Sequence, residues 1–205
     1  MTESGRGRTP EVLGRWRPSC GRPTYNFAMA TDIATELRQA TLADVPELTK
    51  LARTTFVETF GHLYPPEDLS EFLSTARSEE VYSRLVSDPA VYVGVAVTGS
   101  DIPVGYVVAG PCRLPVENLE PRAGEVRELY VHSGFHNQRL GSRLLTAAIE
   151  WLEEQNRVPV YVGVWSENFR AQRLYGRFGF EKVGEYEFPV GRVRDHEFIM
   201  KRRAG

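Results

Sequence analysis

The sequence predicts a mixed α/β domain, with a central, mostly antiparallel sheet of about seven strands and helices on both faces. Strand-like and helix-like segments follow one another in the order β-α-α-α-β-β-β-α-β-α-β-β. Closely spaced strand pairs favour antiparallel hairpins, whereas strands that alternate with helices favour parallel or splayed pairing. The composition, with 41% apolar and 25% charged residues, is typical of globular proteins.

Local patterns place the elements of the first half of the chain. A capping-box-like start at Thr41–Asp44, a stop at Gly61, a Pro65–Pro66 start and a Ser78 start predict three successive helices. A period of two then predicts a hairpin, with Thr98–Asp101 as its turn. The strands of this half are expected at residues 36–40, 91–97 and 104–109.

In the second half, strands and helices alternate. A strand is expected at 125–132, a long amphipathic helix at 139–154, a strand at 158–165, a helix at 167–178 closed by Gly179, and a final strand pair at 180–188 and 193–200. We expect residues 31–205 to form a single domain.

Residues 1–30 differ from the rest of the chain. Gly, Pro, Arg and Ser dominate, and neither a helical nor a strand period is visible. Three interpretations stay open: a disordered tail, an arginine-rich targeting segment without the apolar core of a secretory signal, or extra sequence upstream of a start at Met29. We favour the last.

Charge and cysteine content exclude several classes of protein. Residues 31–205 carry five more acidic than basic residues, so nucleic acid is an unfavourable partner. Cys20 and Cys112 lie apart from each other and from histidine at ligand spacing. We therefore expect no metal site and two reduced thiols in a cytoplasmic protein. No apolar run approaches the roughly 20 residues that span a bilayer, so no membrane partner is expected.

The stretch from Glu125 to Leu145 combines a strand, a tight loop and a helix N-terminus. Such a terminus presents unpaired N–H groups and the positive end of the helix dipole, so it can bind a pyrophosphate. Gly141 would let a phosphate approach the backbone closely, and Arg139 and Arg143 could add positive charge. An ordinary helix start capped by Asn137 stays the alternative.

This loop resembles motif A of the GNAT acetyltransferases, whose pattern is Gln/Arg-x-x-Gly-x-Gly/Ala after a strand. Here the pattern reads His136-x-x-Arg139-x-Gly141. Arg139 takes the place of the first glycine. We expect arginine to be sterically acceptable there, because a residue in the first turn of a helix has a negative φ.

A second stretch is similar to motif B of the same family. A strand is followed by Asn168, Ala171 and Tyr175, and then by Gly179–Phe180. Asn168 and Tyr175 lie seven residues apart and therefore share a helix face. The resemblance covers roughly residues 35–202 and implies the GNAT fold, a mixed sheet with helices on both faces.

A narrower likeness joins the early helices to the C-terminal strands. Residues 55–60, 66–73 and 163–165, and the tail 188–201 with Asp195, resemble the PaiA-type polyamine N-acetyltransferases. This likeness implies a small polyamine acceptor such as spermidine or spermine.

The GNAT resemblance also implies a reaction, in which an acetyl group passes from acetyl-CoA, the co-substrate, to a primary amine. Asn168 would hold the cofactor arm or a water, and Tyr175, beside the sulfur, would protonate the departing thiolate. Backbone groups would pair with the pantetheine arm at Leu129, Tyr130 and Val131. The loop residues expected near the phosphates are His136, Asn137, Gln138, Arg139, Leu140, Gly141 and Ser142.

Such a reaction needs a base, because an alkyl amine has a pKa of roughly 10 and is almost wholly protonated at neutral pH. Glu125 is the candidate, since it stands four residues before Leu129, where many GNAT enzymes carry a carboxylate. Glu128 is its rival. In a regular strand the two point to opposite faces, and a bulge would change that.

The acceptor side rests on composition. Residues 54–80 hold six acids and a single base, Arg77, and the early helices of a GNAT chain usually line the acceptor groove. We therefore expect Glu58, Phe60 and Tyr64 to bind the acceptor. The carboxylate would attract its positive charge, and the two rings would pack on its methylene chain. A solvated acidic helix face with core aromatics is the alternative.

Two other functions stay open. One is a protein N-terminal or lysine acetyltransferase, and the other is a non-catalytic acetyl-CoA-binding regulatory module. Tyr175 and a strand carboxylate favour an enzyme, because a pure binder has no use for them. A homodimer also stays open, because an exposed end strand often pairs in such folds.

Overall fold

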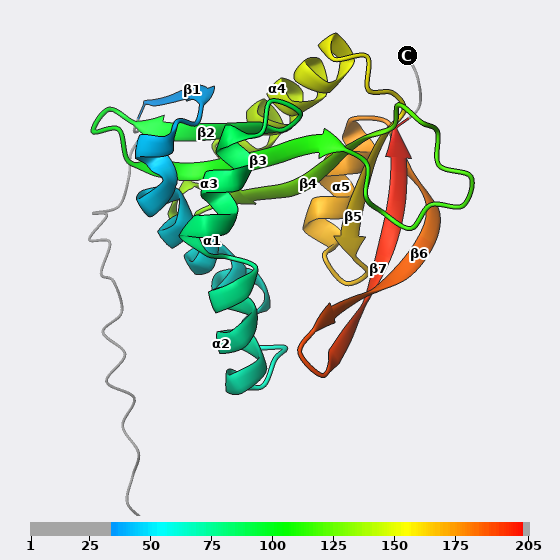
Figure 1. Cartoon of the computed structure of the whole chain (residues 1–205), viewed down its shortest axis with the longest axis horizontal. Helices are drawn as coiled ribbons and strands as arrows, with labels where there is room; N and C mark the ends of the chain where they lie inside the picture. Colours follow the sequence, from blue (N-terminus) through cyan, green and yellow to red (C-terminus); the bar gives the residue numbers. More distant parts are fainter. Residues whose placement is uncertain (1–33, 203–205) are drawn as a thin grey trace, which may run out of the picture.

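The computed structural model describes residues 34–202, so the interpretations of residues 1–30 and of Cys20 lie outside it. Figure 1 shows the described elements. In chain order they are β1 (Thr35–Gln39), a 3-10 turn (Leu42–Asp44), α1 (Val45–Phe60), α2 (Pro66–Thr75), α3 (Glu79–Ser87), β2 (Tyr92–Thr98), β3 (Pro103–Pro111), β4 (Gly124–Val131), a 3-10 turn (Ser133–Phe135), α4 (Leu140–Glu154), β5 (Val160–Trp165), α5 (Phe169–Arg177), β6 (Phe180–Val190) and β7 (Val193–Arg202).

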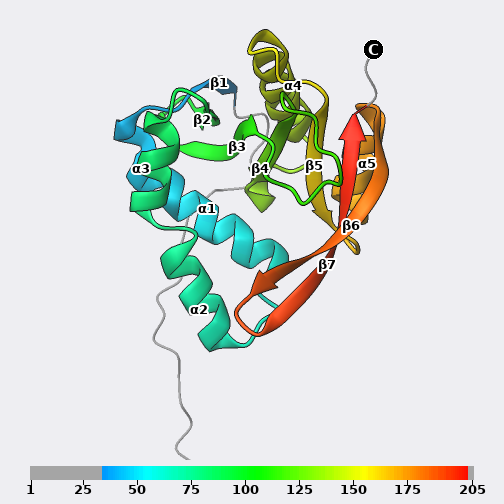
Figure 2. The same ribbon diagram turned by 45° about the vertical axis from the view of Figure 1, so that its right-hand side comes forward.

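The described strands form one sheet in the order β1-β2-β3-β4-β5-β7-β6. Only the β4–β5 pair is parallel, and its neighbours pair antiparallel. Helices α1, α2 and α3 lie on one side of the sheet and α4 and α5 on the other (Figure 2). The predicted element order, the mostly antiparallel sheet and the two helical layers are confirmed.

Each helical layer buries its own core against the sheet. The predicted apolar stripe of α4, which includes Leu144, Ala148 and Leu152, is buried against sheet residues such as Val107 and Val162. On the opposite face, α1 and α3 pack on β2 and β3. Each fully buried Leu or Val side chain contributes about 1.5–3 kcal/mol relative to an exposed one, so these two layers fix the sheet on which the site is built.

The ends of the early helices follow from their sequence. Asp44 accepts hydrogen bonds from the backbone N–H of Thr41 at 2.6 Å and from Arg38 at 2.7 and 2.8 Å. The Arg38 bonds lower the pKa of Asp44. Ser78 caps α3 by accepting from the N–H of Val81 at 3.3 Å. The expected capping box and the Ser78 start are therefore confirmed.

The centre of the sheet is irregular in two ways. β4 and β5 pair only between Gly124–Val126 and Val160–Val162, and beyond these residues they diverge. Opposite β3, the register shifts between Val108 and Ala109, so that Arg127 is the extra residue of a β-bulge in β4. The divergence opens a space in the sheet, and the bulge changes which side chains face it.

Among residues 34–202, no helix is long and apolar enough to cross a membrane.

Candidate active site

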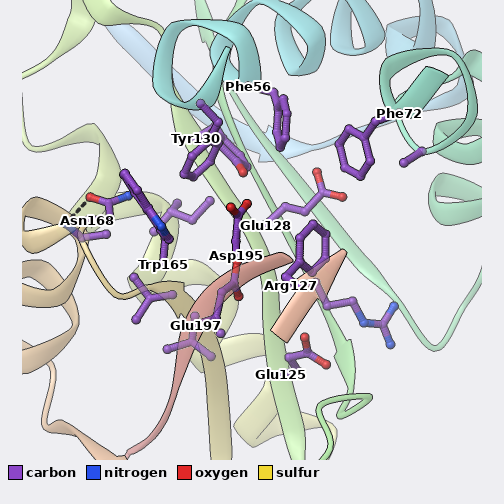
Figure 3. Close-up of a pocket in the computed structure, with 18 of the residues that line it drawn as sticks. Phe56, Phe72, Glu125, Arg127, Glu128, Tyr130, Trp165, Asn168, Asp195 and Glu197 are labelled. Atoms are coloured by element: carbon purple, nitrogen blue, oxygen red, sulfur yellow. Dashed lines mark hydrogen bonds between the residues drawn. The ribbon is translucent and has the colours of Figure 1, made fainter. Parts of the chain in front are cut away.

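Two cavities meet where β4 and β5 diverge. The first has a volume of about 450 Å³ and is lined by Glu125, Glu128, Asp195 and Glu197, against Arg77 and Arg127; we call it the acidic cavity (Figure 3). The second has a volume of about 350 Å³ and is lined by Arg139, Arg170 and Arg177; we call it the basic cleft. None of the described residues that line the basic cleft is Asp or Glu. The cavities share four lining residues, Leu129, Tyr130, Asn168 and Ala171.

Hydrogen bonds hold the loop of the basic cleft to β4 and to α5. The ring nitrogen Nε2 of His136 lies 2.8 Å from the carbonyl oxygen of Val131. Because a carbonyl only accepts, Nε2 carries the proton and Nδ1 is left to accept from Arg170 at 2.8 Å. Arg170 also donates to Asn137 at 3.3 Å. A guanidinium from α5 is thereby held beside the N-terminus of α4.

The backbone conformation of Arg139 differs from the one expected from the sequence. Its φ is +59°, in the left-handed region, so the expectation of a negative φ is wrong. Arg139 is also the N-cap of α4, so the alternative of a helix start capped by Asn137 is wrong too. Asn137 is also left-handed, with a φ of +67°. Arg139 therefore keeps the backbone conformation that glycine adopts freely, at a cost of roughly 1–2 kcal/mol. Leu140, Gly141 and Ser142, in the first turn of α4, all line the basic cleft.

Most of the other loop and strand residues expected to bind the cofactor lie in the basic cleft. Leu129, Tyr130, Val131, His136 and Asn137 line the basic cleft, and Gln138 does not. Past Val126, the edge of β4 that faces β5 has no strand partner within residues 34–202. Backbone groups on that edge are therefore available to a ligand.

Asn168, at the start of α5, lines both cavities, and Tyr175 of the same helix lines the acidic cavity. The Asn168 side chain caps the helix by accepting from the N–H of Ala171 at 3.1 Å. Tyr175 is 6% exposed and lines the acidic cavity, and burial raises the pKa of its hydroxyl. Its phenol therefore stays protonated at neutral pH.

The bulge places Glu125 and Glu128 on the same side of β4. Both carboxylates line the acidic cavity, although three residues separate them. The core residues Val126 and Leu129, also three apart, pack together on the α4 face. The alternation of a regular strand is thus shifted by one residue at Arg127.

The two glutamates have opposite surroundings. Glu128 accepts from Arg77, from the Tyr82 hydroxyl at 3.0 Å and from the Tyr106 hydroxyl at 2.7 Å. Its carboxylate is therefore occupied by three donors, one of them the Arg77 guanidinium with which it forms an ion pair. Glu125 is 7% exposed and accepts the backbone N–H of Arg113 at 2.7 Å. Burial raises the pKa of Glu125 above its ordinary value.

Strand β7 adds two carboxylates that sequence reasoning did not assign to the site. Asp195 and Glu197 alternate along β7 and so face the same side. The hydroxyl of Tyr64 donates to Asp195, and that of Tyr186 donates to Glu197. Burial, with Asp195 nearby, raises the pKa of Glu197. Two acids spaced by two in a half-buried strand were the signal that could have found them.

Aromatic rings form the remaining walls. Phe56 and Phe72 stack with centroids 4.7 Å apart, and Phe60 meets Trp165 edge-on at 5.8 Å. The guanidinium of Arg77 lies 5.5 Å from the centre of the Phe56 ring. This arrangement suits an apolar chain with cationic ends.

Of the three residues expected to bind the acceptor, two line the acidic cavity and one does not. Phe60 and Tyr64 line the acidic cavity. Glu58 lines neither cavity, because its carboxylate turns to Ser133 and accepts from the hydroxyl at 2.7 Å and from the N–H at 3.1 Å. None of the six acids at 54–80 lines the acidic cavity, whose carboxylates come from β4 and β7.

The family profile described as "Acetyltransferase (GNAT) family" matches residues 45–180. An uncharacterized N-acetyltransferase of Lactobacillus delbrueckii subsp. lactis is 26% identical over 80% of this chain and 94% of its own length. The spermine/spermidine N(1)-acetyltransferase of Bacillus subtilis is 30% identical over 42% of this chain and 57% of its own length.

Solved structures share the fold. The PaiA N-acetyltransferase of Thermoplasma acidophilum, crystallised in complex with coenzyme A, superposes with a TM-score of 0.67 at 17% identity. The match covers 83% of this chain and 99% of that one. The ribosomal-protein-S18-alanine N-acetyltransferase of Escherichia coli superposes with a TM-score of 0.60 at 16% identity, over 84% of this chain and 97% of that one.

The chain therefore belongs to the acetyltransferase (GNAT) family, and it is an acyltransferase. The basic cleft fits an anionic cofactor, because three arginines and a helix N-terminus line it without a carboxylate. The protein is an acetyl-CoA-dependent N-acetyltransferase.

Proposed function

We propose that the acceptor is a small polyamine such as spermidine or spermine. The acidic cavity carries this proposal: four carboxylates line it against two arginines, one of which is already paired with Glu128. A cationic amine is attracted to such a cavity, and the aromatic walls suit its methylene chain. The partial similarity to a spermine/spermidine N(1)-acetyltransferase supports the same acceptor.

The basic cleft is assigned to the cofactor. Bound acetyl-CoA supplies the acyl group as an activated thioester. The first turn of α4, with Gly141 and Ser142, would hold the pyrophosphate, and Arg170 would add charge from α5. The unpaired edge of β4 at Leu129–Val131 would hold the pantetheine arm. The thioester would then lie where the two cavities meet.

Glu125 is assigned as the base. An acceptor ammonium must lose a proton before its nitrogen can attack the thioester carbonyl. Glu125 faces the acidic cavity, is more basic than usual and has no ion-pair partner within residues 34–202. Glu128 is instead neutralised by Arg77.

Tyr175 is assigned as the acid. Formation of the amide bond breaks the C–S bond, and the departing thiolate needs a proton. Tyr175 is buried on the wall of the acidic cavity, on the helix that Asn168 caps beside the basic cleft. Its burial keeps the hydroxyl protonated until a thiolate forms beside it.

A thiol-release assay tests the acceptor and the acid together. Acetyl-CoA is offered with spermidine, spermine, putrescine, a peptide with a free N-terminus and a lysine peptide. Turnover on spermidine or spermine, reduced by about 10²-fold or more in Tyr175→Phe, is expected. Tyr161→Phe is the matched control, because Tyr161 lines neither cavity and its hydroxyl donates to Glu120.

Other outcomes contradict the proposal in separate ways. Turnover on peptides alone would replace the acceptor and keep the catalytic assignments. Binding of acetyl-CoA by calorimetry without turnover on any amine would indicate a regulatory module. Equal loss in Tyr175→Phe and Tyr161→Phe would remove Tyr175 as the acid.

A further inference from the structure

Glu197 lies in a row of side chains that crosses three strands. Trp165 of β5, Glu197 of β7 and Tyr186 of β6 are direct register partners. All three line the acidic cavity, and the Tyr186 hydroxyl donates to Glu197. The carboxylate is therefore held in the cavity by its neighbour rather than turned to solvent.

Gly163 gives this carboxylate its position. A Cβ added at Gly163 would lie 2.5 Å from the Tyr186 hydroxyl oxygen and 3.1 Å from Oε2 of Glu197. The Tyr186–Glu197 pair therefore lies directly over Gly163 of β5, the strand between β7 and β4. Gly163 also leaves this part of β5 without a side chain, so none from position 163 stands between Glu197 and the β4 side of the cavity.

Glu125 stands on that β4 side. Its register partner on β5 is Tyr161, two residues from Gly163 and on the same face of the strand. The apolar side chain of Leu114 packs on this part of β5, because its Cδ2 would lie 3.2 Å from a Cβ at Gly163. Both carboxylates are thus in an environment where charges are screened less than in water.

We propose that Glu197 is a positioning residue for Glu125: held over Gly163 by Tyr186, its negative charge keeps Glu125 ready to take a proton from the acceptor. The inference rests on the proposed role of Glu125 as base. The proton passes from the ammonium nitrogen to a carboxylate oxygen of Glu125, and the freed lone pair forms the C–N bond as the C–S bond breaks. Tyr175 protonates the departing thiolate, and the second nitrogen proton then passes to the Tyr175 phenolate and restores its hydroxyl.

Other groups near Glu125 and Glu197 also act on the pKa values of the two carboxyls. Arg113 and Arg127 lie near Glu125 and favour its ionised form, although burial outweighs them in raising its pKa. Asp195 and Glu125 both add to the burial that raises the pKa of Glu197. The Tyr186 hydrogen bond favours ionised Glu197. Arg77 and Glu128, which also line the cavity, form an ion pair with each other.

A titration that needs no turnover tests the inference. The carboxyl carbons of ¹³C-labelled glutamates are followed by NMR against pH, with the Glu125 signal assigned from its loss in Glu125→Gln. In Glu197→Gln, which keeps an acceptor for Tyr186, the pKa of Glu125 is expected to fall by about one unit. Glu187→Gln is the matched control, because it removes the same charge from the exposed side of the same hairpin.

Tyr186→Phe provides a second variant. Loss of its hydrogen bond makes Glu197 harder to ionise, so the Glu125 pKa is again expected to fall, by less than in Glu197→Gln. An unchanged Glu125 pKa in a folded Glu197→Gln protein overturns the inference, as does an equal fall in Glu187→Gln.

The pH dependence of kcat/KM tests the role of Glu197 separately from the proposed role of Glu125 as the base. The acidic limb of the kcat/KM profile is expected to move to lower pH in Glu197→Gln, with a plateau lowered roughly threefold. A limb that persists in Glu125→Gln would remove Glu125 as the base, whatever the titration shows.

Discussion

Glu125 and Glu128 face the same cavity although three residues separate them in one strand, because Arg127 between them forms a β-bulge. The bulge sets a buried carboxylate with a raised pKa beside one that is neutralised by Arg77. The first is suited to accept a proton, and the second to hold the structure around it.

The pH dependence of catalysis is expected to follow Glu125. A base must be ionised, so kcat/KM rises as the pH rises through the pKa of Glu125, which burial places above its ordinary value of 4.5. Glu125→Gln is expected to lose this acidic limb and about 10²–10³-fold of kcat/KM. Glu128→Gln is expected to keep the limb. Steady-state rates from pH 4 to 9 check both, and an intact limb in Glu125→Gln would contradict the assignment.

Stability is expected to depend on Glu128 instead. Arg77 and Glu128 have side chains only 9% and 13% exposed, so Glu128→Gln leaves a buried guanidinium without its counter-charge. The expected loss is about 3–5 kcal/mol of unfolding free energy, measured by urea denaturation. Glu47→Gln, which breaks the exposed Lys50–Glu47 pair, is expected to cost under about 0.5 kcal/mol. Similar losses in the two variants would contradict the role of Glu128.

Affinity for the cofactor is expected to depend on Arg170. Its guanidinium lies beside the N-terminus of α4, bonded to His136 and Asn137. Arg170→Ala is expected to raise the KM for acetyl-CoA about five- to tenfold with little change in kcat, an effect that weakens at high salt. Arg173→Ala is the matched control, because Arg173 is exposed on the same helix and does not line the basic cleft. Equal changes in the two variants would argue against a specific contact.

The left-handed backbone at Arg139 predicts a stabilising substitution. Arg139→Gly removes the steric cost of a φ of +59°, and the larger entropy of unfolded glycine offsets part of the gain. A net gain of about 0.5–1 kcal/mol is expected by thermal or urea denaturation. Arg143→Gly, in the interior of α4, is expected to destabilise by about 1 kcal/mol. A loss of stability in Arg139→Gly would show that the arginine side chain contributes more than the backbone costs.

Local patterns were sufficient for the order of elements. The alternation at 91–97, the capping residues Thr41 and Ser78, and Gly179 with a φ of +81° specify strands, helix starts and a helix end through neighbours in the chain. The same local information located the loop at 136–142 and the helix that carries Asn168 and Tyr175, because a strand–loop–helix sequence is contiguous.

Tertiary structure decided the chemistry of the acidic cavity. The sequence by itself determined that two glutamates stand in β4, but a bulge depends on pairing with β3, which lies outside the strand's own pattern. The ion pair that occupies Glu128 joins residues 51 positions apart. Glu197 reaches the cavity because β7 is placed beside β5, where Gly163 leaves room for it. Long-range strand pairing sets such contacts, so no local period in the sequence reports them.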